Sequence, residues 1–266
     1  MDGAGRLLLL QLLQARQQAC RCLRTWRETD RLLALLSGIV EPELRLHLFG
    51  EYLHDRPPEE AAWTISRLWD RMTGGDRKVQ GVCLGLLDLN RLTRVVPSSY
   101  LNAVRGALER HGETSAGLLA QETKRRDAAE TEIAPPPKEP VGYRISLARR
   151  PVPRLIERML FDPEPRVIQT VLANPRLSET EVVRLAASRR APPEALEAIA
   201  ADDRWIARYP VKLALANNPA APSRLVLRLL PYLMRQDLRD LAAGAFSATV
   251  REQAAALLAR RQGSEG

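Results

Sequence analysis

Residues 171–175 read Val-Leu-Ala-Asn-Pro, and two related segments flank them: Ser-Leu-Ala-Arg-Arg-Pro at 146–151 and Leu-Ala-Asn-Asn-Pro at 215–219. Each segment is followed by an apolar run with helical spacing, such as Val-Val-x-Leu-Ala at 182–186. A degenerate fourth copy, Arg-Arg-Ala-Pro-Pro, occupies 189–193. Self-similarity on this scale is typical of a fold built from short, stacked helical units.

Proline punctuates these units, because it lacks an amide hydrogen and disfavours α conformation in the residue before it. Ser178 and Glu181 have the spacing of a capping box, which predicts a helix start there, and Pro193 suits a first helical turn. Helices this short cannot bury their apolar stripes alone, so an all-α fold of the α-solenoid type is expected. Asn174-Pro175 and Asn218-Pro219 are each expected to end one helix and start the next segment, and Asp162-Pro163 and Tyr209-Pro210 are expected to mark similar boundaries.

At these residues the chain resembles the leucine-rich repeat variant family, bacterial arrays of about 24-residue units, and the broader HEAT-like α-solenoids. The matching pieces are Leu-Ala-(x)-Asn-Pro and the turn Asp-Pro-Glu-Pro-Arg-Val at 162–167, in about a third of the chain. The resemblance implies a superhelix of short α and 3₁₀ helices. One member of the family carries an iron–sulfur cluster held by cysteines. Cys20, Cys22 and Cys83 do not supply such a set, so no cofactor is expected.

Composition agrees with an all-helical chain, because aromatic residues make up only 5% and no long stretch alternates with a period of two. The net charge of +8 is unevenly distributed. Residues 1–140 hold 20 basic and 19 acidic side chains, whereas residues 141–266 hold 20 and 13, a net charge of +7. The basic character therefore belongs to the segment with the repeats.

The pattern predicts two helical segments joined by a proline-rich linker. The N-terminal helical-repeat domain is expected at 1–112, with a long helix over 6–36 and further helices beginning near 42, 58, 77 and 98. The charged and proline-rich stretch at 113–142 is expected to be an extended linker. The C-terminal array is expected at 143–266.

Three cysteines do not make a disulfide framework, which favours a reducing bacterial cytoplasm. The leucines at 7–13 only faintly resemble a signal peptide, because Gln11 interrupts them and no cleavage site follows. No apolar run approaches the roughly 20 residues that span a bilayer, so no membrane partner is expected.

A basic ridge is the predicted binding surface. The doublets Arg149-Arg150 and Arg189-Arg190 precede proline turns, and stacking of the units would align such corners along one edge. This ridge could bind an acidic protein or the phosphates of a nucleic acid. Turn arginines in an arginine-rich chain can also simply be solvated. The predicted binding residues are Arg149, Arg150, Arg166, Arg176, Arg189, Arg190, Arg208 and Lys212.

Other constellations have simpler structural interpretations. Glu43, His47, Glu51 and His54 share a helical stripe, but a di-iron site needs a second Glu-x-x-His pair, which the sequence lacks. The segment 202–209 has acidic residues beside Trp205, as do some HEAT-like DNA glycosylases, although it also fits a helix cap followed by a core stripe.

No catalytic or metal-binding residue is therefore predicted. The expected function is a non-catalytic scaffold that binds a macromolecule, most simply a protein, with a nucleic-acid-binding module or DNA-processing enzyme as the alternative.

Overall fold

The computed structural model describes residues 27–120, 139–150, 159 and 161–263, and all regular structure in these residues is helical. The all-α prediction is therefore confirmed. The chain divides into two compact units, residues 1–119 and 120–266, and each is described by itself. Among the described residues, no helix is both long enough and apolar enough to cross a membrane.

The first unit follows the helix starts that its prolines predict. Residues 27–37 are helical, and the remainder of the helix expected over 6–36 lies outside the described residues. The helix expected to begin near 77 ends at Leu86, and the Asp88 carboxylate then accepts hydrogen bonds from the amides of Asn90 and Arg91, which begins a new short helix. The elements are α2 (Pro42–His54), α3 (Pro58–Thr73), α4 (Arg77–Leu86), α5 (Leu89–Leu92), α6 (Ser98–Arg110) and the 3₁₀ helix η1 (Thr114–Leu119).

The core of the first unit forms around α3, which packs against α4, α6 and η1. Gly112 has φ of +66°, a left-handed conformation that reverses the chain after α6. Ser66 then donates a 2.5 Å hydrogen bond to Glu113, and η1 buries Leu118 and Leu119. The first unit thus extends to residue 119, beyond the start at 113 expected for the linker, because two leucines after the glycine turn complete its core.

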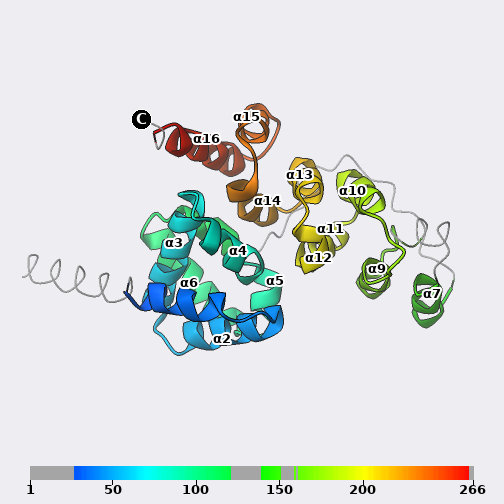
Figure 1. Ribbon diagram of the computed structural model, residues 1–266, viewed down its shortest axis with the longest axis horizontal. Coiled ribbons are helices and arrows are strands. Elements are labelled where there is room, and N and C mark those ends of the chain that lie inside the picture. The colour runs from blue at the N-terminus through cyan, green and yellow to red at the C-terminus, as the bar shows by residue number, and fades with distance from the viewer. Residues whose placement is uncertain (1–26, 121–138, 151–158, 160, 264–266) are drawn as a thin grey trace, which may run out of the picture. The chain divides into compact units, whose positions relative to one another are not determined.

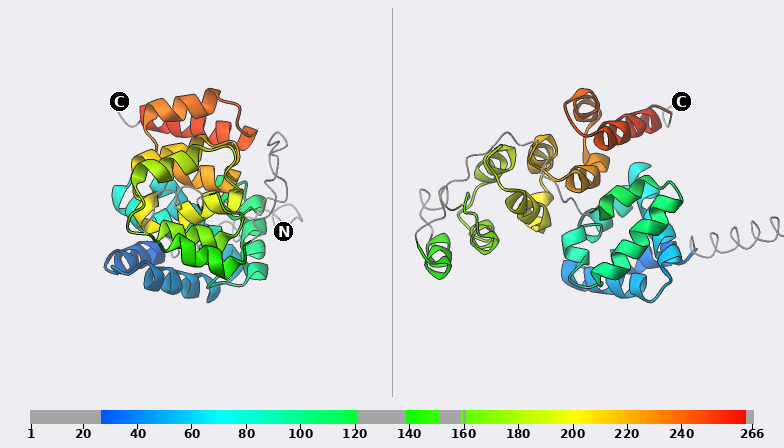
Figure 2. Two further views of the ribbon diagram at one scale, coloured as in Figure 1. Left: turned by 90° about the vertical axis from the view of Figure 1, so that its right-hand side faces the viewer. Right: turned by 180° about the vertical axis from the view of Figure 1, so that it is seen from behind.

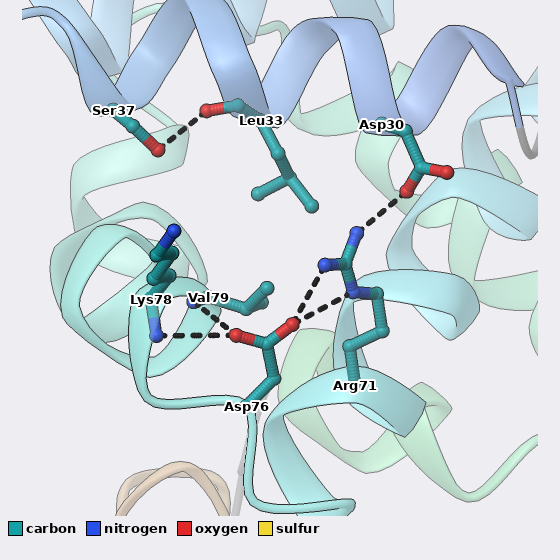
Figure 3. Close-up of polar contacts among 7 residues, drawn as sticks. All are labelled: Asp30, Leu33, Ser37, Arg71, Asp76, Lys78 and Val79. Atoms are coloured by element: carbon teal, nitrogen blue, oxygen red, sulfur yellow. Dashed lines mark hydrogen bonds and ion pairs between the residues drawn. The ribbon is translucent and has the colours of Figure 1, made fainter.

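Three elements of the first unit are joined by the guanidinium of Arg71 (Figure 3). From α3 it donates to Asp30 of the helix at 27–37 at 2.5 Å and to Asp76 at 2.6 and 3.1 Å. Asp76 in turn caps α4 by accepting the amides of Lys78 and Val79. Partial burial alone raises the pKa of Asp76, but the hydrogen bonds from Arg71 and these amides outweigh it and hold the pKa below its ordinary value of 3.8.

We expect Asp76→Asn to lower the free energy of unfolding by about 1 kcal/mol at pH 7, because the amide keeps the cap but loses the charged bond to Arg71. A carboxylate with a depressed pKa stabilises the fold above its unfolded pKa, and this contribution is lost as the pH falls through the lower folded value. Urea unfolding should therefore separate the wild type from the variant at pH 7, and the difference should shrink as the pH falls from about 4 through the lower folded pKa.

Glu41→Gln is the matched control, since Glu41 precedes α2 without a side-chain capping bond. Its unfolding should follow the wild type over the whole pH range. A gap between wild type and Asp76→Asn that stays constant with pH would contradict the role assigned to the carboxylate charge.

The second unit is a succession of short helices (Figure 1). Helix α7 packs against α9, and α9 packs against α11; we call these three the first row. Helix α10 packs against α13, and these two form the second row. The elements are α7 (Val141–Ala148), α9 (Pro165–Leu172), α10 (Glu179–Ala187), α11 (Pro193–Ala201), α12 (Asp203–Ile206), α13 (Tyr209–Asn217), α14 (Ser223–Leu229), η2 (Leu230–Tyr232), α15 (Arg235–Ala243) and α16 (Ala248–Gly263).

Most of the predicted helix boundaries of the second unit are confirmed. Helices α9 and α13 end just before Asn174 and at Asn217, Ser178 forms a complete capping box, and Pro193 begins α11. Tyr209-Pro210 also marks a boundary between helices, but it lies on the start side, because α12 ends at Ile206 and this pair begins α13. A proline in the first turn leaves no helical hydrogen bond unmade, so the same residue type can mark either boundary.

Candidate binding surface

The connections between the helices of the second unit share one turn, which we call a corner. At each corner residue the amide donates to the carbonyl three residues earlier, with distances of 2.9–3.3 Å. In every case but the first, the side-chain oxygen also accepts the amide two residues later, at 2.8–3.2 Å. The corner residues are Arg150, Asp162, Asn174, Ser188, Asp202 and Asn218.

Consecutive corner residues are 12 to 16 residues apart in the sequence. Two neighbouring helices of the same row have one other corner between theirs, so their corner residues are separated by two of these intervals. This explains the irregular spacing of the sequence motifs. The segments at 146–151 and 171–175 end neighbouring helices of the first row, whereas the segment at 215–219 ends a helix of the second row. The segment at 189–193 is likewise a regular corner of the second row.

Two corner asparagines join neighbouring helices of a row. The Asn174 side-chain amide donates to the carbonyls of Ala148 at 3.0 Å and Arg150 at 3.3 Å. Asn218 makes the same pair of bonds, to Ala186 at 2.6 Å and Ser188 at 2.9 Å. In both cases the acceptors are the corner residue of the preceding helix and the residue two positions before it. Both asparagines are buried, and each bond satisfies a carbonyl that a helix end leaves free.

Tryptophan and arginine side chains bind two other helix ends. The Leu172 carbonyl at the end of α9 accepts the Trp205 indole N–H at 3.1 Å and a guanidinium N–H of Arg204. The Ala200 carbonyl at the end of α11 accepts from Arg228 at 3.2 Å. Trp205 is 3% exposed, so it belongs to the core and cannot stack on a nucleic-acid base.

The predicted arginine ridge is divided between the two rows. Arg149 and Arg150 lie at the carboxyl end of α7, next to the corner of α9 and Arg176, and all three are exposed. Arg189 and Arg190 are also exposed, but they follow the corner of α10, which lies beside the end of α13. The two doublets also differ in position: Arg150 is itself a corner residue, whereas Arg189 and Arg190 follow the corner residue Ser188.

Three further residues of the predicted ridge have partners within the chain. Arg208 forms an ion pair with Glu179 at 2.7 Å, and Arg166 lies 3.9 Å from Glu164 with its side chain 78% exposed. Lys212 differs from the expectation, because it is buried and its ammonium group donates to the carbonyls of Ile206 at 2.9 Å and Ala207 at 2.8 Å. Burial lowers the pKa of Lys212. Lys212 therefore stabilises the end of α12 rather than forming part of the surface.

The histidine and cysteine constellations form no metal centre within the part of the chain that the structure describes. His47 and Glu51 make an exposed contact of 3.3 Å, while Glu43 binds Arg91 at 3.1 Å. Burial raises the pKa of the Cys83 thiol to about 12, so this cysteine is unreactive. Cys20 and Cys22 lie outside the described residues.

One exposed residue of the second unit was missed by the sequence analysis. Tyr143 on α7 is 53% exposed, although tyrosine in a short amphipathic helix would ordinarily pack in the core. No local signal marks it, because the contact of α7 with α9 decides which face of α7 is buried. Comparison with protein-family models, with curated proteins and with solved structures found no match for this chain.

Proposed function

We propose that this protein is a non-catalytic scaffold of the α-helical repeat type, with a second unit that forms an α-solenoid similar to the leucine-rich repeat variants. The two rows of short helices with one recurrent corner support this architecture. The ligand is an acidic protein, and the binding surface is formed by Arg149, Arg150 and Arg176 at two adjacent corners of the first row.

The arginines of the second unit fall into two groups, those that bind groups within the fold and those that are exposed, and the proposal rests on this observation. Several of them bind carbonyls or carboxylates within the fold, as Arg144, Arg204, Arg224 and Arg261 do. By contrast, Arg149, Arg150 and Arg176 are exposed at two adjacent corners, and no described residue supplies a carboxylate to pair with them. Exposed guanidinium groups concentrated at one place attract and orient an anionic partner.

Nucleic acid is the second candidate, favoured by the net charge of +7 on residues 141–266. An acidic protein is preferred because Trp205, which follows Asp202, Asp203 and Arg204 in the sequence, is buried in the core and cannot stack on a base. Tyr143 on α7 is exposed, but a single ring does not form the series of aromatic platforms on which successive bases stack.

Charge reversal in the full chain tests the proposal. We expect wild-type protein to capture an acidic protein from a lysate of its own host in near-stoichiometric amount, and Arg149→Glu/Arg150→Glu to reduce this capture by about tenfold or more. The control is Arg239→Glu/Arg251→Glu, which makes the same change in net charge at two other exposed positions of the second unit. Capture by the control should stay within about twofold of wild type.

Binding of duplex DNA is the result that would contradict an acidic protein as the ligand. Binding of duplex that falls steeply with salt and is abolished by Arg149→Glu/Arg150→Glu would replace the acidic protein with nucleic acid as the ligand. Equal loss of protein capture in the doublet variant and in the control would show that only overall charge matters, which contradicts a defined surface.

A further inference from the structure

Arg150 is the corner residue whose side chain makes no hydrogen bond within the described part of its own turn. The other corners carry Asp, Asn or Ser, whose oxygen accepts an amide, whereas a guanidinium only donates. The corner position has a second use, seen at Asn174 and Asn218, which is to donate to the end of the preceding helix in the row. Helix α7 is the outermost described helix of the first row, so no described helix end precedes Arg150 (Figures 1 and 2).

The outward side of α7 is a continuous exposed stripe. Tyr143, Ser146 and Arg150 are spaced at i, i+3 and i+7 and are all exposed, which places them on one face of the helix. Arg144 and Ala148 are buried on the opposite side. We call Tyr143, Ser146, Arg149 and Arg150 the leading face of α7.

The leading face repeats a combination that the protein already uses to bind a helix end. At the carboxyl end of α9, Arg204 stacks on the Trp205 ring at 4.1 Å, and both side chains donate to the Leu172 carbonyl. Arg261 likewise donates to the carbonyls of Leu233 at 2.6 Å and Pro231 at 2.7 Å. The free carbonyls of a helix end carry a partial negative charge, and a guanidinium can bind several of them together.

From these observations we infer that the leading face of α7 docks the carboxyl end of an α-helix belonging to the protein partner. The apolar side of that helix covers Tyr143, and its last carbonyls accept hydrogen bonds from Arg149 and Arg150. Docking extends the first row by one helix in the register that Asn174 sets between α7 and α9. This inference rests on the proposed function and specifies which structural feature of the partner is recognised.

A stapled helical peptide provides a direct probe. We choose a fluorescein-labelled copy of residues 163–174, amidated at its end, because it contains α9, the helix whose end is bound by an aromatic residue and an arginine. Fluorescence anisotropy with the full chain should show saturable binding. We expect Arg149→Glu/Arg150→Glu to weaken the affinity by about tenfold or more, and Tyr143→Ser by several-fold.

Arg189→Glu/Arg190→Glu is the matched control, since it reverses two exposed charges of the same unit at a corner of the other row. It should change the affinity by less than about twofold. A second peptide that ends in two lysines should bind more weakly than the first, because its positive charge opposes the arginines.

Two results would overturn the inference: the wild type shows no saturable binding of the peptide, or both doublets weaken it equally. These failures are distinguishable from failure of the proposed function. If the wild-type protein captured an acidic protein but did not bind the peptide, the proposed scaffold function would stand and only this docking mode would be rejected.

Discussion

Asn218→Ala is expected to lower the free energy of unfolding by about 3 kcal/mol. The side chain is 2% exposed and makes three hydrogen bonds, to the carbonyls of Ala186 and Ser188 and from the amide of Ala220. Alanine leaves these three backbone groups without their partner, and each loss costs about 1 kcal/mol. Urea denaturation followed by circular dichroism measures the change.

Asn217 supplies the control for this substitution, because the preceding residue is also asparagine but is exposed at the end of α13. Asn217→Ala should alter stability by no more than about 0.5 kcal/mol. Hydrogen exchange should also become faster at the ends of both α10 and α13 in Asn218→Ala. If Asn217→Ala and Asn218→Ala destabilised the protein equally, the corner bonds would not be what joins the second row.

Arg144→Met is expected to cost about 3–5 kcal/mol, because it leaves a buried carboxylate without its counter-ion. The side chains of Arg144 and Asp162 are 7% and 2% exposed and form an ion pair that joins α7 to the corner preceding α9. Arg144 also donates to the Glu139 carbonyl at 3.1 Å, but loss of that single bond is a minor part of the effect. Thermal or urea unfolding of the full chain gives the measurement.

The double variant Arg144→Met/Asp162→Asn separates the charge from the contacts. Asparagine can still accept the Glu164 amide, as the corner asparagines accept theirs, while the buried charge is removed. Most of the lost stability should therefore return. Arg166→Met, at a 78% exposed side chain, is the surface control and should be nearly neutral. A double variant no more stable than Arg144→Met would show that the charge was not responsible.

The local sequence was sufficient to predict most of the helix boundaries. Proline at the first turn, the Ser178 capping box and Asn-Pro after helix ends act through bonds within a few residues, so they can be recognised without knowing the fold. Tyr209-Pro210 marks the start of α13 and not the end of a helix, a choice that the local pattern leaves open because proline is compatible with both boundaries.

The candidate site was predicted only in part. Exposure of the arginines at 149, 150, 176, 189 and 190 follows from their positions beside turns. Their division between two rows could not be predicted, because the contacts of α7 with α9 and of α10 with α13 link segments more than 20 residues apart. The burial of Lys212 depends on the end of α12 lying next to its ammonium group, which no local pattern encodes.

By itself, the sequence determined that this protein is helical, where most of its helices begin and end, and that its second half carries the excess positive charge. These properties depend on backbone conformation and side-chain chemistry over a few residues. Only the tertiary structure decided which helices became neighbours, which arginines bind helix ends within the fold, and that Arg150 has no described helix end to bind. Such choices follow from the packing of apolar faces between distant segments, and that packing is fixed only when the chain is folded.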